Sequence, residues 1–135
     1  MSRAFSSPPR LQLRLAVAGD VAVGPGKIAL LEAIERHGSI AAACREMGLS
    51  YKKAWRLIET MNRHLERPVL ETRAGGSQRG GAVVTSSGQV LVARYRALTQ
   101  AVAALPEAEQ LVALMALPDA TDATDDTPTD DASST

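Results

Sequence analysis

Residues 39–65 constrain the fold of this chain more than any other stretch, because they predict two helices joined by a tight turn. Ser39 and Ser50 suit the N-cap position, since a serine hydroxyl accepts a hydrogen bond from a backbone N–H that the first helical turn leaves free. Gly48 suits the left-handed backbone that often ends a helix. The pattern therefore predicts a short helix over residues 40–47 and a second helix over residues 51–65.

The two faces of the second predicted helix differ in character. Its apolar residues recur at helical spacing: Ala54, Ile58, Met61 and Leu65. Its other face carries Lys52, Lys53, Arg56 and Arg63, with Tyr51 at its start. This is the pattern of a helix-turn-helix, whose second helix offers its N-terminal turn to a DNA major groove. The alternative is a pair of surface helices whose basic side chains are only solvated.

The segment after these helices predicts a β-hairpin. Pro68 blocks further helix, and residues 69–73 and 82–85 have the composition of two short strands. The loop between them contains four glycines, which let a backbone approach a sugar-phosphate chain closely. We interpret the hairpin as the wing of a winged helix, with Arg73, Gln78 and Arg79 as DNA-contacting residues. A plain hairpin tip is the alternative.

The N-terminal part predicts a flexible arm over residues 1–9 and then a strand, because apolar residues alternate over residues 11–17. With a second strand at residues 21–23 it forms a hairpin that must pair with the wing, pack on a helix or meet a partner chain. Residues 24–29 fit a dinucleotide fingerprint, but no returning strand follows before residue 69. We therefore interpret Gly24 and Pro25 as the start of a helix.

The C-terminal part predicts a long helix from Ser86, with Gln89 at capping-box spacing. Five residues step by four, three, four and three and form an apolar seam: Leu91, Tyr95, Leu98, Val102 and Leu105. Such a seam is expected to bury itself against a second protomer, or else to fold back on its own domain. Pro106 ends or kinks the helix, and a shorter helical segment follows. Residues 118–135 predict a disordered acidic tail.

The formal net charge of zero conceals an asymmetry. All 15 Lys and Arg residues precede residue 97, together with seven acids, and the remaining eight acids follow it. A basic body suits a polyanionic partner, although an imbalance of this size can also arise by chance. The single cysteine fits a reducing cytosol, and nothing approaches the ~20 apolar residues of a membrane span. We expect a cytoplasmic protein.

The residues predict no catalytic or metal-binding constellation. His37, His64 and Cys44 do not have the spacing of a zinc site, and the carboxylates are scattered singly. Cys44 is interpreted as a packing residue, and Trp55 as a core residue in preference to a base-stacking one. We therefore expect no enzyme activity, metal or cofactor.

These residues resemble the DNA-binding domain of ModE-type, molybdate-responsive transcription regulators, which are relatives of LysR-type winged helices. The shared residues include Gly24-Pro25-Gly26-Lys27, Gly38-Ser39-Ile40, Ser50-Tyr51-Lys52, Ala54-Trp55, Met61-Asn62, Gly75-Gly76, Gly80-Gly81-Ala82, Thr85, Gly88 and Tyr95. The resemblance covers about residues 11–105 and implies a homodimer, held by the long helix and the N-terminal strands, on an inverted-repeat operator. It also implies that five residues face the groove, namely Ser50, Tyr51, Lys52, Lys53 and Arg56, and that Arg79 faces the backbone.

The resemblance differs at the C-terminus, where the family's full-length regulators carry oxyanion-binding domains and this sequence has an acidic tail. We interpret the chain as a stand-alone form, controlled by a separate effector-binding protein, another signal or none. The expected fold is mainly α with a small β component, a winged helix-turn-helix over residues 10–85 followed by a dimerisation segment over residues 86–117. The expected function is transcription regulation through double-stranded DNA. Two alternatives remain: a protein-interaction module without DNA readout, and an oxyanion- or nucleotide-binding protein that uses residues 24–29.

Overall fold

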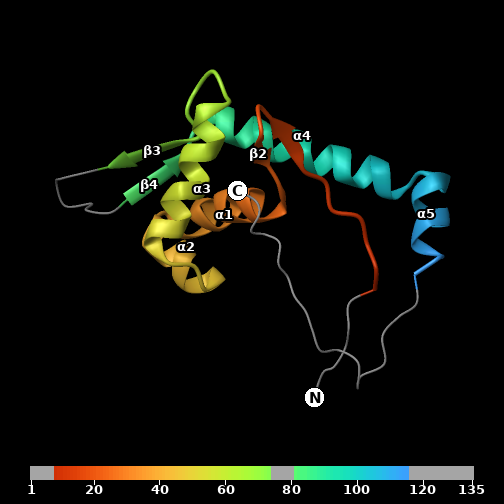
Figure 1. Ribbon diagram of the computed structural model, residues 1–135. Coiled ribbons are helices and arrows are strands. Elements are labelled where there is room, and N and C mark those ends of the chain that lie inside the picture. Colours follow the sequence, from red (N-terminus) through yellow and green to blue (C-terminus); the bar gives the residue numbers. More distant parts are fainter. Residues whose placement is uncertain (1–7, 74–80, 116–135) are drawn as a thin grey trace, which may run out of the picture. The chain divides into compact units, whose positions relative to one another are not determined.

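A computed structural model describes residues 8–73 and 81–115 (Figure 1). The elements, in chain order, are β1 (Leu15–Val17), β2 (Asp20–Val23), α1 (Pro25–His37), α2 (Ile40–Met47), α3 (Tyr51–Arg63), β3 (Leu70–Arg73), β4 (Gly81–Val84), α4 (Ser86–Ala103) and α5 (Pro106–Val112). The predicted fold class is confirmed, because helices dominate and the two described sheets are small antiparallel hairpins. Residues 13–97 form one compact unit, and residues 98–115 belong with residues 8–12 to another.

The helix ends follow the predicted capping residues. The Ser39 hydroxyl accepts from the backbone N–H of Ala42 at 3.0 Å, and the Ser50 hydroxyl accepts from that of Lys53 at the same distance. Gly38 and Gly48 end α1 and α2 with φ values of 76° and 70°, the left-handed region that favours glycine. The second helix, predicted to end at about Leu65, ends at Arg63. These caps fix the turn between α2 and α3.

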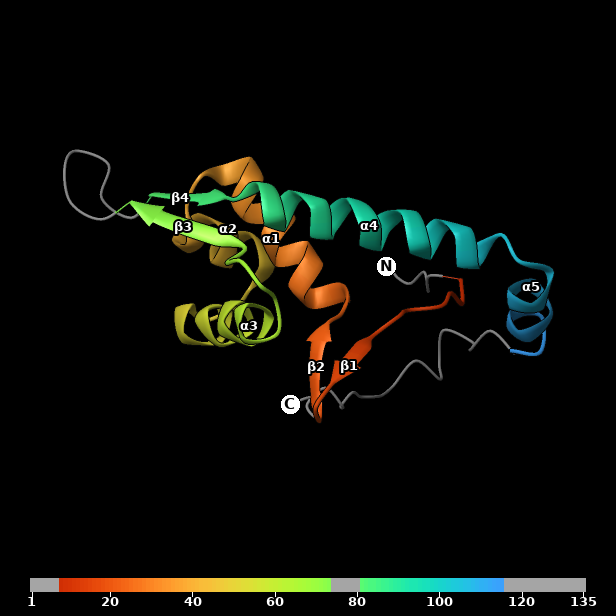
Figure 2. The same cartoon turned by 90° about the horizontal axis from the view of Figure 1, so that it is seen from above.

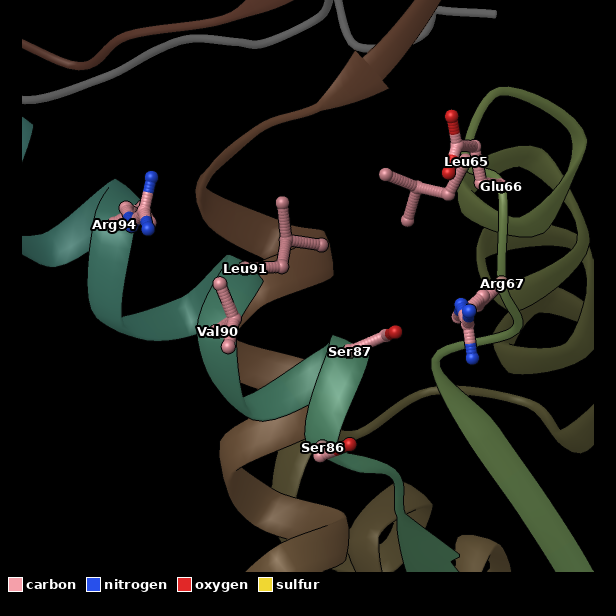
Figure 3. Close-up of a pocket in the computed structure, with 8 residues that line it drawn as sticks. All are labelled: Leu65, Glu66, Arg67, Ser86, Ser87, Val90, Leu91 and Arg94. Carbon is pink, nitrogen blue, oxygen red and sulfur yellow. The ribbon is translucent and has the colours of Figure 1, made fainter.

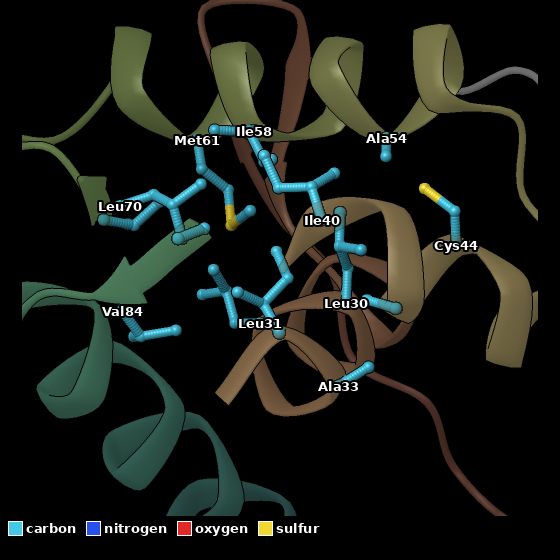
Figure 4. Packing of buried hydrophobic residues seen from close by; sticks show 14 residues of the cluster. Leu30, Leu31, Ala33, Ile40, Cys44, Ala54, Ile58, Met61, Leu70 and Val84 are labelled. Carbon is cyan, nitrogen blue, oxygen red and sulfur yellow. The ribbon is translucent and has the colours of Figure 1, made fainter. Parts of the chain in front are cut away.

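The main core lies where α1, α2, α3 and the β3–β4 hairpin meet (Figure 4). Leu30 and Leu31 of α1 are fully buried, and so are Ile58 and Met61 of α3. Ala43 and Ala54 are also fully buried, and their small side chains let α2 and α3 pack closely. Cys44 and Trp55 pack with this core as expected, Cys44 buried and Trp55 half-buried. The predicted apolar stripe of α3 is therefore the face that positions the helix.

The second hairpin is anchored to the helix-turn-helix at both ends. β3 and β4 pair antiparallel from Leu70 opposite Val84 to Arg73 opposite Gly81. At one end the side-chain oxygen of Asn62 accepts from the backbone N–H of Val69 at 2.9 Å. At the other end the backbone N–H of Ala82 donates to the Gly38 carbonyl at 2.9 Å. The hairpin that we interpret as the wing is thus fixed to α3 and to the turn before α2.

The N-terminal hairpin differs from its prediction. Of the predicted strand over residues 11–17, the structure assigns Leu15–Val17, whose three residues are exposed, while Leu13 is half-buried against a small core. The sheet contains only β1 and β2, and its buried side chains, Ala22 and Val23, come from β2. They pack with Ile28 of α1 and Tyr95 of α4 in a second small core. Of the three predicted options for this hairpin, the structure shows packing on helices.

The cap at the start of α4 also differs from its prediction, because Thr85 caps the helix in place of Ser86. The Thr85 hydroxyl accepts from the backbone N–H of Gly88 at 3.1 Å, and the Gln89 side chain contacts Glu35 of α1 at 3.1 Å. Arg96 forms a second link to α1, with its Nε 3.0 Å from the Glu32 carboxylate. The first part of α4 is therefore held against α1.

The predicted seam of α4 is divided between inward and exposed positions. Leu91 is half-buried against both cores, and Tyr95 is buried with its hydroxyl donating to the Leu13 carbonyl at 2.9 Å. In the unit that contains residues 98–115, Leu98 is 55% exposed and Leu105 47% exposed, while Val102 is half-buried. The first two seam residues thus pack within their own chain, and the later leucines are open.

Candidate nucleic-acid interface

The outer face of α3 is the candidate interface. Ala54, Ile58 and Met61 turn inward, so helical geometry turns Lys52 and Arg56, four residues apart, to the opposite side. Lys52, Lys53 and Arg56 are all exposed, and none forms a salt bridge with a described residue. Glu59 is an exposed acid on the same helix. We call the surface formed by Ser50, Tyr51, Lys52, Lys53 and Arg56 the α3 face.

The first turn of α3 combines aromatic and basic side chains. Tyr51 is 53% exposed, and its ring meets that of Trp55 edge to face, with 6.3 Å between the centroids and an interplanar angle of 74°. Trp55 packs partly against the core, so it supports Tyr51 from below. Tyr51 is therefore presented outward by a fixed neighbour, beside Lys52 and Ser50.

Figure 2 shows how the helices are arranged behind this face, with α1 between α3 and the first turns of α4.

Arg63 also lies on the predicted basic face, but it forms an ion pair with another residue of the same chain. Its Nη1 donates to Asp20 Oδ2 at 2.8 Å, and His64 Nε2 lies 2.7 Å from the same oxygen. The hydrogen bonds from His64 and Arg63 hold the pKa of Asp20 below its ordinary value. The cluster links the N-terminal hairpin to the end of α3, and it leaves Lys52, Lys53 and Arg56 as the unpaired described cations of this helix.

A second cluster supports the turn before α2. The carboxylate of Glu46 pairs with Arg36, and its other oxygen lies 2.6 Å from His37 Nε2. The hydrogen bond from Arg36 and the one from His37 lower the pKa of Glu46 to about 2. The pairing joins the last turn of α1 to α2 and so helps to orient the helix that supports α3.

The sequence-based prediction assigns three DNA-contacting residues to the wing. Gln78 and Arg79 lie outside the described residues, and Arg73 ends β3. The structure therefore shows the base of the wing next to the helix-turn-helix, and the contacts of the three side chains stay predictions.

A groove of about 580 Å³ lies at the other end of α3 (Figure 3). Its lining combines Leu65, Val90 and Leu91 with polar residues at the start of α4. Arg67 and Arg94 stand on different sides of it. The groove begins after α3 ends, so it is separate from the α3 face.

Sequence reasoning missed the residues that hold the interface in place from a distance. Asp20 lies 43 residues before Arg63, and Asn62 bonds across seven residues to Val69. The spacing of residues along the chain does not predict the contact between Asp20 and Arg63, because the two are far apart in sequence. The contact between Asn62 and Val69 had a weak signal, because asparagine inside a helix often bonds to a backbone group.

Metal-ligand clusters and membrane-spanning helices are absent from the part of the chain that the structure describes. Residues 8–73 and 81–115 contain no cluster of three or more His, Cys, Asp or Glu side chains able to hold a metal ion. Among the same residues, no helix is long and apolar enough to cross a membrane.

Comparison with known proteins shows what residues 26–89 and their surroundings are similar to. The sequence pattern of the family described as bacterial regulatory helix-turn-helix protein, lysR family, matches residues 26–89. The molybdenum-pterin-binding protein MopA of Rhodobacter capsulatus is 48% identical over 97 residues, which are 69% of this chain and 37% of MopA. The molybdenum transport protein ModE of Azotobacter vinelandii is 46% identical over 91 residues, 66% of this chain and 34% of that protein.

A third relative is the DNA-binding transcriptional dual regulator ModE of Escherichia coli strain K12, 42% identical over 76 residues, which are 56% of this chain and 29% of that protein. The chain thus spans about a third of the length of these curated relatives. The fold and the family match define a LysR-like winged helix-turn-helix domain. Within that class, the matched region is a ModE-type DNA-binding domain, and the resemblance seen in the sequence is confirmed.

Proposed function

We propose that this chain is a sequence-specific regulator of transcription that binds duplex DNA, with α3 in the major groove. The observation that carries the proposal is the α3 face, where Lys52, Lys53 and Arg56 are exposed and have no salt bridge to a described carboxylate. The capped N-terminal turn of α3 is the part of a recognition helix that contacts base edges in proteins of this class. Tyr51 and Ser50 provide the neighbouring hydrogen-bonding groups.

The proposed roles follow from chemistry. Lys52, Lys53 and Arg56 neutralise phosphates or contact base edges, for which a guanidinium suits guanine in particular. In the wing, we propose that Arg73, Gln78 and Arg79 contact the backbone or the minor groove. The anchoring of β3 by Asn62 and of β4 by Gly38 supports this, because it fixes where the wing leaves the helix-turn-helix.

We also propose that the chain acts as a homodimer on an inverted repeat. Leu98 and Leu105 supply exposed apolar side chains in the unit that contains the end of α4, and Leu15 and Val17 supply them on β1. Exposed apolar side chains of this size favour a protein contact. Since Leu91 and Tyr95 pack within their own chain, the proposed dimer contact uses the later seam residues, Leu98, Val102 and Leu105.

Two of the relatives described above are named for molybdenum, and we propose that the genes regulated by this chain belong to molybdenum homeostasis. The matched region is the DNA-binding one, and we propose an effector-binding protein as a further partner of this chain. The proposed regulator performs no catalysis.

Selection of bound duplexes from a random pool tests the function. The full chain is incubated with the pool at about 0.1 M salt, and the stoichiometry on the enriched duplex is then measured by sedimentation. We expect an inverted repeat bound by two chains. If the pool shows no enrichment and the chain instead captures a protein partner after nuclease treatment, the protein-interaction alternative is correct.

A further inference from the structure

Three basic side chains from separate segments converge beside the α3 face. Arg14 lies over the start of α1, because a Cβ added at the buried Gly24 would stand 3.5 Å from Arg14 Cγ and 4.0 Å from Arg14 Nε. Lys27 lies in the first turn of α1. Lys53 lies in the first turn of α3, and its charge acts on Lys27. We call Arg14, Lys27 and Lys53 the hairpin-side patch.

The positive charges of this patch are close enough to act on one another. Burial lowers the pKa of Lys27, and the charges of Arg14 and Lys53 lower it further, against the opposing attraction of Asp20. The Asp20 carboxylate is already hydrogen-bonded to Arg63 and His64. None of the three patch residues forms a salt bridge with a carboxylate in residues 8–73 or 81–115.

Crowded like charges destabilise a folded chain unless an anion compensates them. The N-terminal hairpin brings Arg14 to the start of α1, where it adds to the repulsion between like charges. The described residues offer the patch no counter-charge other than Asp20, which is already bonded to Arg63 and His64. A cluster of side chains that costs stability and lies beside a binding surface is typical of a functional site. The chemistry of three cations without a directional acceptor suits a phosphate chain in preference to a base edge.

We propose that Arg14 and Lys27 act with Lys53 as a second set of contacts to the DNA phosphates, extending the interface from α3 to the start of α1. The inference rests on the proposed function and adds two residues that belong to neither the helix-turn-helix nor the wing. The contacts are independent of base sequence, so they set the affinity and position of the protein on the duplex. Base readout remains with α3.

The test compares the salt dependence of binding for the full chain and its variants on the selected duplex and on a scrambled one. In Arg14→Gln/Lys27→Gln, we expect the slope of log K against log salt to fall by about 0.9 for each phosphate that the variant no longer neutralises. Affinity should weaken by a similar factor on both duplexes, so the preference for the selected one stays. The matched control is Arg94→Gln, an exposed cation on α4, which should leave the slope unchanged.

Two further variants make the result decisive. The charge-keeping pair Arg14→Lys/Lys27→Arg should retain the wild-type slope, which separates charge from packing. The thermal midpoint of Lys27→Gln should be equal to or above that of the wild type, because the substitution relieves repulsion. If the glutamine pair keeps the wild-type slope while Lys52→Gln makes it shallower, the patch inference is overturned and the proposed function stands. If the wild type binds neither duplex, both are overturned.

Discussion

At the scale of single residues, small side chains and caps position the elements that carry the interface. Gly88 shows this most clearly: a Cβ there would stand 2.5 Å from the Val69 carbonyl oxygen and 2.7 Å from Val84 Cγ1. α4 therefore starts directly against the base of the wing, with no room for a side chain. Gly26 offers the opposite case, because a Cβ there meets no atom within 4 Å.

We predict that Gly88→Ala destabilises the protein by about 1–3 kcal/mol, because the backbone at Val69 must move to admit the methyl group. Gly26→Ala, within α1, should instead stabilise it by about 0.4–1 kcal/mol by restricting the unfolded chain. Urea unfolding of both variants measures the two effects. Equal stabilities for the two variants would contradict the close approach at Gly88.

Local sequence predicted the caps correctly for a physical reason. Ser39, Ser50 and Gly48 act on backbone groups within a few residues, so their spacing carries the full information. The predicted start of α4 at Ser86 agrees with the structure, but its predicted cap does not, because Thr85 and Ser86 are adjacent and both are good caps. The choice between them depends on Val69 and Pro68, which also bond to Thr85 and are distant in sequence.

At the scale of elements, each helix of the helix-turn-helix is held by a charged cluster from another segment. Asp20 ties the N-terminal hairpin to the end of α3, and Glu46 ties α2 to the end of α1. Periodicity cannot predict such pairs, because it shows which face of a helix is apolar and not which element covers it. The same limit explains Tyr95, whose seam position gave no indication that it would bond to Leu13.

The Glu46 cluster predicts a pH dependence of stability. Because Arg36 and His37 lower the pKa of Glu46 from 4.5 to about 2, the folded state binds this proton less readily than the unfolded state does. The contribution is therefore complete above the ordinary pKa and disappears as the pH falls from 4.5 through about 2. It is small, since the side chains are largely exposed.

We expect Glu46→Gln to lower the urea midpoint at pH 7 and to differ much less from the wild type at pH 2. The control is Glu59→Gln, which removes an exposed acid without a salt bridge to any described residue. A gap between Glu46→Gln and the wild type that is the same at both pH values would show that the ion pair is not its cause.

At the scale of the whole molecule, the sequence predicted a basic body and a C-terminal apolar seam, and both bear on assembly. The fold class and family follow from residues 26–89, where the apolar periodicity, the caps and the family match agree. The sequence does not predict which surface covers the seam, because an apolar stripe packs equally well against its own chain or against another copy. The structure assigns Leu91 and Tyr95 to the former and leaves Leu98 and Leu105 exposed.

We predict that Leu98→Glu/Leu105→Glu converts a dimer into a monomer and weakens binding to the selected duplex at least tenfold, while the monomer stays folded. Sedimentation and circular dichroism measure the two properties. Gln100→Glu is the matched control, because this exposed residue lies on the opposite side of α4 from the seam. A double variant that remains dimeric would place the dimer contact elsewhere, for example on Leu15 and Val17.

Binding of a duplex by the α3 face is the central claim, and the salt dependence of binding for Lys52→Ala tests it most directly. Wild type and variant are titrated onto the selected duplex between about 50 and 200 mM salt, with Arg94→Ala as the control. We predict that the slope of log K against log salt becomes shallower by about 1 for Lys52→Ala and is unchanged for Arg94→Ala. A slope for Lys52→Ala equal to that of the wild type would contradict the claim.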